Sequence, residues 1–309
     1  MTQTMVLGID IGGTNTKYGL VDNNGQIHIQ GSISTIGHAG PGAFVTALHA
    51  EIQKVAGGIK ITGIGVGAPN GNINTGEIIF APNMPWRGII PLAKLLETAF
   101  GVPTILTNDA NAAAIGEMKF GAAKGIKDFI LVTLGTGVGS GFVANGQLIY
   151  GHDGFAGELG HMIAIRNGRI CGCGRKGCLE AYTSATGIVK TAHEWLEAGK
   201  ESTLSKSATI TSEGIYKAAV AGDAMAIDLL GYTGSILGMT LADAVAVTSP
   251  EAIIFFGGLA QAGDLLLGHV KNHLEANLLN IYQNKIKILP SALPGSDSAI
   301  LGAAALVNN

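Results

Sequence analysis

The chain has few charged residues, and neither sign of charge is in excess. Only 13% of its 309 residues are charged, and the formal net charge is −3. A protein that binds nucleic acid through phosphate contacts usually carries a basic face, and this balance does not indicate one. With 47% hydrophobic residues, the composition also excludes a disordered chain. We therefore expect folded domains, with enough length for two cores, and no nucleic-acid partner.

Long apolar segments and targeting signals are also missing. No run approaches the roughly 18 uninterrupted apolar residues that indicate a membrane span. The longest candidate, Ile253 to Leu259, is interrupted by Gly257 and Gly258. The first six residues lack the basic region and the apolar stretch of a secretory signal. We expect a cytoplasmic protein with no membrane partner.

Cysteine is scarce, but its three copies lie together. Cys171, Cys173 and Cys178 fall within eight positions, and His161 precedes them by ten. Three thiolates and one imidazole form a common closed, tetrahedral zinc site, and the glycines between them let a short backbone surround one ion. A disulfide would leave one thiol over, and nothing else indicates an oxidising compartment. The pattern predicts a structural zinc site.

Glycine is abundant, with 47 copies, about twice the usual frequency. Residues 4–33 and 129–149 share one plan: a strand, a turn rich in glycine and threonine, a second strand, a short turn and a third strand. The short turns, Asp22–Gly25 and Asn145-Gly146, are both followed by glutamine. The two segments begin about 125 residues apart, which indicates an internal repeat with one copy per domain.

Elsewhere strands alternate with helices, which is typical of the α/β class. We expect loops at 67–76 and 81–86 and a domain boundary near 118–127. Further strands are expected at 59–66, 102–107, 251–256 and 285–289, and helices at 41–55, 91–100, 109–120, 186–198, 212–221, 223–247 and 298–307.

The two glycine-rich turns, residues 12–17 and 135–141, are candidate phosphate sites. A glycine-rich turn after a strand offers peptide N–H groups to a phosphate, and Asp10 ends the first strand where Mg²⁺ would be bound. A plain hairpin is the alternative for either turn. Gly172–Gly177 and Gly63–Ala68 match dinucleotide motifs by letter, but one lies in the cysteine cluster and the other precedes a loop. No P-loop motif occurs.

Polar residues at predicted loop positions suit a polyhydroxylated substrate. Asn108-Asp109 lies where a strand meets a helix; it is either a helix cap or the place of a general base for a hydroxyl nucleophile. Further amide, carboxylate and imidazole groups would give buried sugar hydroxyls their partners. These further residues are Asn83, Glu158, His161 and Glu180.

Five motifs together resemble the ROK family of sugar kinases, most closely the bacterial glucokinases, over essentially the whole chain. They are Asp10–Lys17, Asn108–Asn111, Leu134–Gly139, Glu158–His161 and Cys171–Glu180. The resemblance implies a hexokinase-like, actin-type (ASKHA) fold: two RNase H-like domains flank a cleft that binds ATP and sugar. The small domain would be 1–120, joined by the C-terminal helix 298–309. The large domain, 121–297, would contain the zinc.

The resemblance also assigns roles to residues. Asp109 would be the catalytic base, Asp10 would hold Mg²⁺ largely through water, and His161 would bind zinc with one ring nitrogen and sugar with the other. Sugar contacts would come from Asn83, Asn108, Asp109, Glu158, His161 and Glu180. The nucleotide would be bordered by Asp10, Gly12, Gly13, Thr14, Asn15, Lys17, Gly135, Thr136, Gly137, Gly257 and Gly258.

The expected activity is ATP-dependent phosphorylation of glucose at its 6-hydroxyl. One alternative is a kinase of the same family for N-acetylglucosamine, N-acetylmannosamine or a broader set of hexoses. A second is a sugar sensor without catalysis, although the first turn begins about ten residues into the chain and leaves no room for a DNA-binding segment. Asn70 stands where the family often has glycine, so the resemblance does not fix the sugar preference. The family also implies a homodimer.

Overall fold

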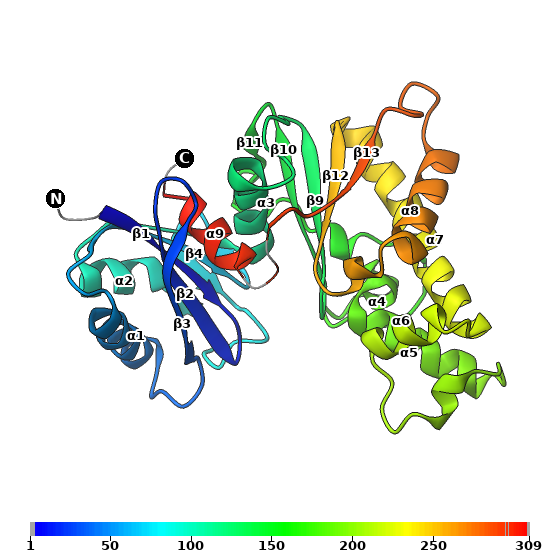
Figure 1. Ribbon diagram of the computed structural model, residues 1–309, viewed down its shortest axis with the longest axis horizontal. Coiled ribbons are helices and arrows are strands. Elements are labelled where there is room, and N and C mark those ends of the chain that lie inside the picture. Colours follow the sequence, from blue (N-terminus) through cyan, green and yellow to red (C-terminus); the bar gives the residue numbers. More distant parts are fainter. Residues whose placement is uncertain (1–3, 294, 296, 308–309) are drawn as a thin grey trace. The chain divides into compact units, whose positions relative to one another are not determined.

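The computed structural model describes residues 4–293, 295 and 297–307, and it divides into two units. The first consists of Met1–Gly125, Gly141–Ala156 and Ala292–Asn309, and the second of Ile126–Ser140 and Gly157–Ser291. Strands and helices alternate along the chain, as Figure 1 shows for each unit. The predicted α/β class is confirmed.

A five-stranded sheet forms the centre of the first unit, in the order β3-β2-β1-β4-β8. The first three strands form an antiparallel meander, and β4 and β8 then add on in parallel. The strands are β1 (Thr4–Ile11), β2 (Asn15–Val21), β3 (Ile27–Ser34), β4 (Lys60–Ala68) and β8 (Thr104–Asn108).

Helices cover both faces of this sheet because β1 alternates its side chains between them. Leu7 and Ile9 pack with Phe44 of α1 (Pro41–Val55) and Leu96 of α2 (Leu92–Phe100). On the other face, Val6 packs with α9 (Ser298–Ala305), which also packs on α3 (Asp109–Phe120). By this alternation, Asp10 lies on the face that α3 and α9 cover.

Glycines let α9 approach the strands closely. A Cβ atom added at Gly8 or Gly65 would collide with the carbonyl oxygen of Ile300 or Ala303. At Gly302, it would lie 2.6 Å from the carbonyl oxygen of Ala112 in α3. The Gly63–Ala68 stretch is therefore a helix-packing surface of β4, which agrees with its exclusion as a dinucleotide site.

The second sheet has the same plan, in the order β11-β10-β9-β12-β13. The predicted repeat is thus present. The chain first passes between the units at Gly125–Ile126, within the range 118–127 where we expected a boundary, and passes back within β10. Its strands are β9 (Phe129–Leu134), β10 (Val138–Ala144), β11 (Gln147–Leu148), β12 (Ala252–Phe256) and β13 (Lys287–Pro290). The helices of this half are α4 (Glu180–Thr183), α5 (Ala185–Glu197), α6 (Ser212–Val220), α7 (Ala224–Thr248) and α8 (Asp264–Asn277).

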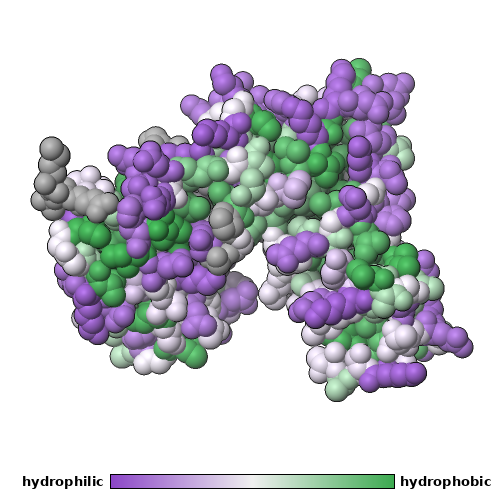
Figure 2. All heavy atoms as spheres, in the orientation of Figure 1, coloured by the Kyte–Doolittle hydropathy of each residue, from purple (hydrophilic) through white to green (hydrophobic). Residues whose placement is uncertain are grey.

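Among the described residues, α7 alone is long and apolar enough to cross a membrane, by length and composition. Most of its apolar window is buried, 61%, and it packs extensively on α8. These are the properties of a core helix. Figure 2 shows polar side chains spread over the visible face of each unit, with apolar groups between them.

The structure differs from the predictions in three respects. Residues 81–86 form a loop, as expected, but the expected loop at 67–76 contains β5 (Gly71–Asn72). This strand pairs with β6 (Glu77–Ile79), which pairs with β7 (Ile89–Ile90), in a small antiparallel sheet. Residues 141–156, expected in the second domain, belong to the first unit, because the Asn72 and Asn74 amides donate to the carbonyl oxygens of Asp153 and His152. The two units also have similar lengths, so neither is distinctly the larger.

We expect Gly65→Ala to lower the free energy of unfolding by about 2–3 kcal/mol, because the new methyl group forces α9 away from β4. The matched control is Gly268→Ala in α8, where no atom lies within 4 Å of the added Cβ. There the change should stabilise by up to about 1 kcal/mol through helix propensity. Urea denaturation of both variants checks this, and equal stabilities would contradict the packing role.

Candidate active site and metal centre

The carboxyl ends of β1, β4 and β8 bring two carboxylates to one edge of the first sheet. Asp10 pairs in register with Gly67, and Gly67 pairs with Thr107, so β1 and β8 are roughly 10 Å apart. Asp109 follows β8 directly and begins α3. A Cβ at Gly67 would lie 3.5 Å from the Asp109 Cα, so the start of α3 lies over Gly67. In open α/β sheets this edge is the usual place for ligands.

Both carboxylates have raised pKa values. Burial, and then repulsion by Asp109, raises the pKa of Asp10 to about 6, although Lys17 opposite it on β2 has the reverse effect. Desolvation by the surrounding protein raises the pKa of Asp109 as well, while its side chain remains accessible to solvent. A desolvated but accessible carboxylate is suited to accept a proton, and two such groups favour a cation nearby.

The neighbouring predicted residues form the rest of this group. The Asn108 side chain accepts a hydrogen bond from the Ala110 N–H (2.8 Å), so it does cap α3. The first turn is closed by a bond from Gly12 N–H to the Asn15 carbonyl oxygen (3.0 Å). A Cβ at Gly13 would collide with the Asn83 carbonyl oxygen, which places the Asn83 loop against this turn. The exposed side chains here are Thr14, Asn15, Lys17, Asn83 and Asp109.

The second glycine-rich turn, in the second unit, is held from several sides. Its carbonyl oxygens at Gly135 and Thr136 accept bonds from the start of α5, and Gly135 N–H donates to the Gly137 carbonyl oxygen. No described residue accepts a hydrogen bond from the N–H groups of Thr136 and Gly137. These two donors are available to an anion.

Gly257 and Gly258 lie beside this turn. They follow β12, whose last residue, Phe256, pairs with Thr133 of β9. Gly257 has a φ of +105°, and a Cβ there would lie 2.5 Å from the Leu134 carbonyl oxygen, so only glycine fits. The second sheet thus brings both predicted glycine stretches to one edge.

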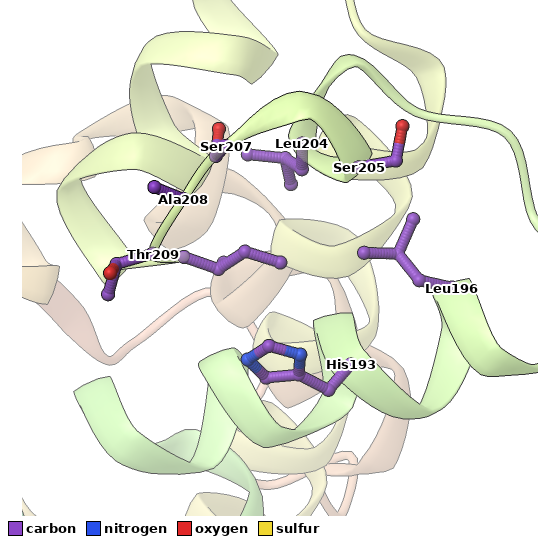
Figure 3. A pocket seen from close by; sticks show the side chains of 8 residues that line it. His193, Leu196, Leu204, Ser205, Ser207, Ala208 and Thr209 are labelled. Atoms are coloured by element: carbon purple, nitrogen blue, oxygen red, sulfur yellow. The ribbon is translucent and has the colours of Figure 1, made fainter.

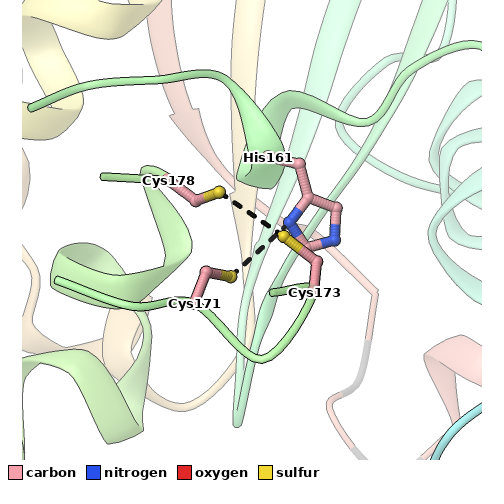
Figure 4. A group of neighbouring side chains, drawn as sticks. All are labelled: His161, Cys171, Cys173 and Cys178. Atoms are coloured by element: carbon pink, nitrogen blue, oxygen red, sulfur yellow. Dashed lines mark hydrogen bonds between the residues drawn. The ribbon is translucent and has the colours of Figure 1, made fainter. Parts of the chain in front are cut away.

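The three cysteines and His161 face a common point, as Figure 4 shows. Their ligand atoms all lie within 4.8 Å of one another; Cys173 Sγ is 3.6 Å from Cys178 Sγ, and Cys171 Sγ is 3.8 Å from His161 Nδ1. Ligands of a tetrahedral zinc ion lie about 3.5–3.8 Å apart. Burial and the neighbouring thiols raise the pKa of Cys171 to about 12, and burial also raises that of Cys178, so a bound cation would favour their thiolate forms. The residues present fit zinc.

The two ring nitrogens of His161 face different groups. Nδ1 points to the cluster, whereas Nε2 lies 4.0 Å from a carboxylate oxygen of Glu158. Only part of this side chain is covered, with 28% of it exposed. One nitrogen can therefore bind a metal ion while the other remains available to a ligand.

Glu180 connects the cluster to the glycine-rich turn. Its Oε2 accepts a bond from Val138 N–H (3.0 Å), and its Oε1 lies 3.6 Å from Cys171 Sγ. A Cβ at Gly137 would collide with Oε2. The second unit therefore brings Glu158, His161, Glu180 and the turn into one group, as the first unit does for Asp10, Asn83 and Asp109.

Arg169 has a role that the sequence did not indicate. Its guanidinium group pairs with Glu194, donates to Thr191 Oγ1 (2.9 Å) and the Ala181 carbonyl oxygen (3.1 Å), and lies over the Tyr182 ring. These bonds fix the cysteine-containing loop to α4 and α5. No local pattern could have revealed it, because its partners lie 12 to 25 residues away in the sequence.

A hollow of about 300 Å³ lies elsewhere in the second unit, between α5 and the segment 204–210. Figure 3 shows that its lining includes the His193 ring and several small polar side chains. It contains none of the predicted site residues, and most of its lining is exposed. We assign no chemistry to it.

Comparisons with known sequences agree with the five motifs. A model of the ROK family matches residues 6–309. A glucokinase from Halalkalibacterium halodurans is 38% identical over 99% of this chain and 96% of its own length. An N-acetylmannosamine kinase from Salmonella typhi is 32% identical, with 97% of each chain covered.

Solved structures include both kinases and regulators. The ROK family glucokinase of Streptomyces griseus, in complex with glucose and AMPPNP, has a TM-score of 0.82 and 33% identity, with 98% of both chains covered. A ROK family transcriptional regulator, a homologue of the Escherichia coli MLC protein, has a TM-score of 0.90 and 26% identity; the alignment covers 99% of this chain and 78% of the regulator.

Because the pKa of Asp10 is raised in the folded protein, we expect the ionised form of this side chain to lower the stability of the fold. The pKa of Asp10 is 3.8 in the unfolded chain and about 6 in the folded protein. Asp10 therefore contributes most to the stability of the fold below pH 3.8, and this contribution is lost as the pH rises through about 6. Without nucleotide or Mg²⁺, Asp10→Asn should therefore stabilise the protein at pH 7.5, by about 1–2 kcal/mol after allowing for partial exposure. The gain should shrink towards pH 4.

Urea denaturation at a series of pH values measures this difference, with Asp228→Asn on the exposed side of α7 as the control. A stability gain that did not depend on pH, or a loss of stability at pH 7.5, would contradict the electrostatic explanation.

Proposed function

The chain belongs to the ROK family, as its motifs predicted, and we propose that it transfers a phosphoryl group from ATP to the 6-hydroxyl of glucose. The observation that carries the proposal is the Asp109 carboxylate. It is accessible, its pKa is raised by desolvation, and it stands at the carboxyl edge of a sheet beside Asp10. Together with full-length similarity to a glucokinase, this favours a kinase that activates a hydroxyl group.

In this mechanism Asp109 accepts the proton of the 6-hydroxyl, early or late in the transfer. Phosphoryl transfer depends mainly on positioning and on charge stabilisation, so the other residues hold and neutralise phosphates. Mg²⁺ bound with ATP supplies positive charge, and Asp10 would hold it largely through water. Lys17 and the N–H groups of the turns at Gly12–Asn15 and Gly135–Gly137 would bind phosphate oxygens. Gly257 and Gly258 would border the nucleotide.

The proposed sugar ligands are polar side chains, some in the first unit and some in the second. Each buried sugar hydroxyl needs a partner, and amide, carboxylate and imidazole groups can both orient and satisfy it. For the second unit this is supported by His161 Nε2, which faces away from the cysteines, and by Glu158, whose carboxylate oxygen lies 4.0 Å from it. The complete set is Asn83, Asn108, Asp109, Glu158, His161 and Glu180.

We propose that His161, Cys171, Cys173 and Cys178 bind one structural zinc ion. Four protein ligands complete the coordination sphere, which excludes a role in activating water. The metal would instead orient His161 and keep Glu180 in place, because Cys171 lies beside Glu180 and His161 binds through Nδ1.

N-acetylmannosamine is the second candidate substrate, because a kinase of this name aligns over 97% of the chain. Asn70 is a further reason for testing other hexoses: its amide donates to the Ile79 carbonyl oxygen (3.0 Å), and its φ is +51°.

A regulator without catalysis is disfavoured by the presence of Asp109, Asp10 and Lys17. From the family we also propose a cytoplasmic homodimer.

We expect glucose to have the highest kcat/KM in a panel with N-acetylmannosamine, N-acetylglucosamine, mannose and fructose, measured as ADP release.

Asp109→Ala should lower kcat about 10²- to 10⁴-fold and leave the KM for glucose within a few fold, because it removes the proton acceptor. Asp128→Ala, in the same assay, controls for the loss of an aspartate.

Near-normal activity of the Asp109 variant would contradict its role as the base. A preference for an N-acetylated hexose would assign the enzyme to the second candidate, and sugar binding without ADP release would favour a regulator.

We expect one zinc ion per chain by elemental analysis. Cys173→Ser should reduce the zinc content, lower the melting temperature and raise the KM for glucose, because the ion orients His161. Lys176→Ala, in the same loop but outside the ligand set, should retain zinc and sugar binding. If zinc-free protein bound sugar normally, the metal would not be needed for sugar binding, which would contradict this role.

A further inference from the structure

The turn at Gly135–Gly137 presents two free N–H donors, and each belongs to a peptide whose carbonyl oxygen is bonded. The Gly135 carbonyl oxygen shares a peptide plane with the Thr136 N–H, and the Thr136 carbonyl oxygen shares one with the Gly137 N–H. A trans peptide is planar, so its C=O and N–H groups point in opposite directions. The groups that bond to the Gly135 and Thr136 carbonyl oxygens therefore also set the direction of the Thr136 and Gly137 N–H groups.

Two adjacent residues at the start of α5 hold them. Ala185 N–H donates to the Gly135 carbonyl oxygen (2.8 Å), and Thr186 Oγ1 donates to the Thr136 carbonyl oxygen (2.8 Å). The first bond comes from the backbone and does not depend on the side chain. The second depends on a hydroxyl group 50 residues away in the sequence.

The Thr186 hydroxyl is itself held in position. Ser184 Oγ lies 2.9 Å from Thr186 Oγ1, accepts a bond from Gly187 N–H (3.0 Å), and lies 2.8 Å from the Glu180 carbonyl oxygen. Ser184 is fully buried. The position of Thr186 is thus tied to the segment that contains Glu180, which follows the cysteine cluster by two residues.

We propose that Thr186 is a positioning residue for the phosphates of ATP: its hydroxyl orients the Thr136–Gly137 peptide so that the Gly137 N–H faces the bound nucleotide. This inference rests on the proposed ATP-dependent function. Thr186 acts through the peptide and does not touch the substrate. A purely structural alternative is that its hydroxyl only supports the start of α5.

The test measures binding of a nonhydrolysable ATP analogue, with Mg²⁺, and of adenosine, by calorimetry on the full zinc-containing protein. Thr186→Val keeps the shape of the side chain and removes the hydroxyl. It should weaken binding of the analogue about 3- to 10-fold, the range expected for one neutral hydrogen bond. Adenosine binding should not change, because adenosine has no phosphate, and Thr186→Ser should restore the wild-type affinity.

Thr248→Val is the matched control, because it removes a hydroxyl that bonds within α7, to the Ala244 carbonyl oxygen (2.9 Å), and should leave both affinities unchanged. In steady state, Thr186→Val should raise the KM for ATP and not that for glucose. Thr186→Ala provides the same comparison if the valine variant does not fold.

Equal weakening of adenosine and of the analogue, or no weakening of either, would overturn the inference in favour of the structural alternative. A wild-type protein that binds the analogue but phosphorylates no hexose would contradict the proposed function and not this inference. A wild-type protein that binds no ATP analogue would contradict both.

Discussion

The Glu180 carboxylate is the contact on which the candidate site in the second unit depends. One of its oxygens accepts the Val138 N–H at the end of the glycine-rich turn, and the other lies beside a cysteine of the metal cluster. Gly137 has no side chain where Oε2 lies, so the turn and the carboxylate fit only with glycine at this position. A change in the cluster would therefore reach the turn directly through this side chain.

Hydrogen bonds to the backbone continue this connection around the turn. Arg169 fixes the cysteine-containing loop to α4 and α5, and the first residues of α5 bind the turn carbonyls. Within the second unit, the metal ligands, Glu180 and the Thr136 and Gly137 N–H groups thus share one continuous set of contacts. Such support outside the direct ligands is what holds functional groups in a productive geometry.

The first unit depends on a different constraint, the close approach of helices to strands. Glycines in β1, β4, α3 and α9 allow backbone contacts that a Cβ atom would prevent. This explains part of the high glycine content of the chain. It also explains the position of Asp109, because α3 begins directly over Gly67.

Local signals predicted much of the structure. Asn108 and the following residues predicted the start of α3, Asn145-Gly146 predicted a hairpin turn, and the spacing of the cysteines predicted the cluster. The small sheet within 71–90 was missed, because strands of two or three residues carry no clear period. Thr186 and Arg169 were missed for another reason: they bond to groups between 12 and 50 residues away, which leave no trace in the local sequence.

The central claim is that one histidine serves both metal and substrate, with Nδ1 of His161 on zinc and Nε2 on the sugar. Anomalous diffraction at the zinc absorption edge, from crystals grown with glucose, tests it most directly. The account predicts one zinc peak bound by His161 Nδ1 and the three sulfur atoms, with sugar hydroxyls hydrogen-bonded to His161 Nε2 and Glu180. A cluster without a metal peak, or glucose bound away from His161, would contradict it.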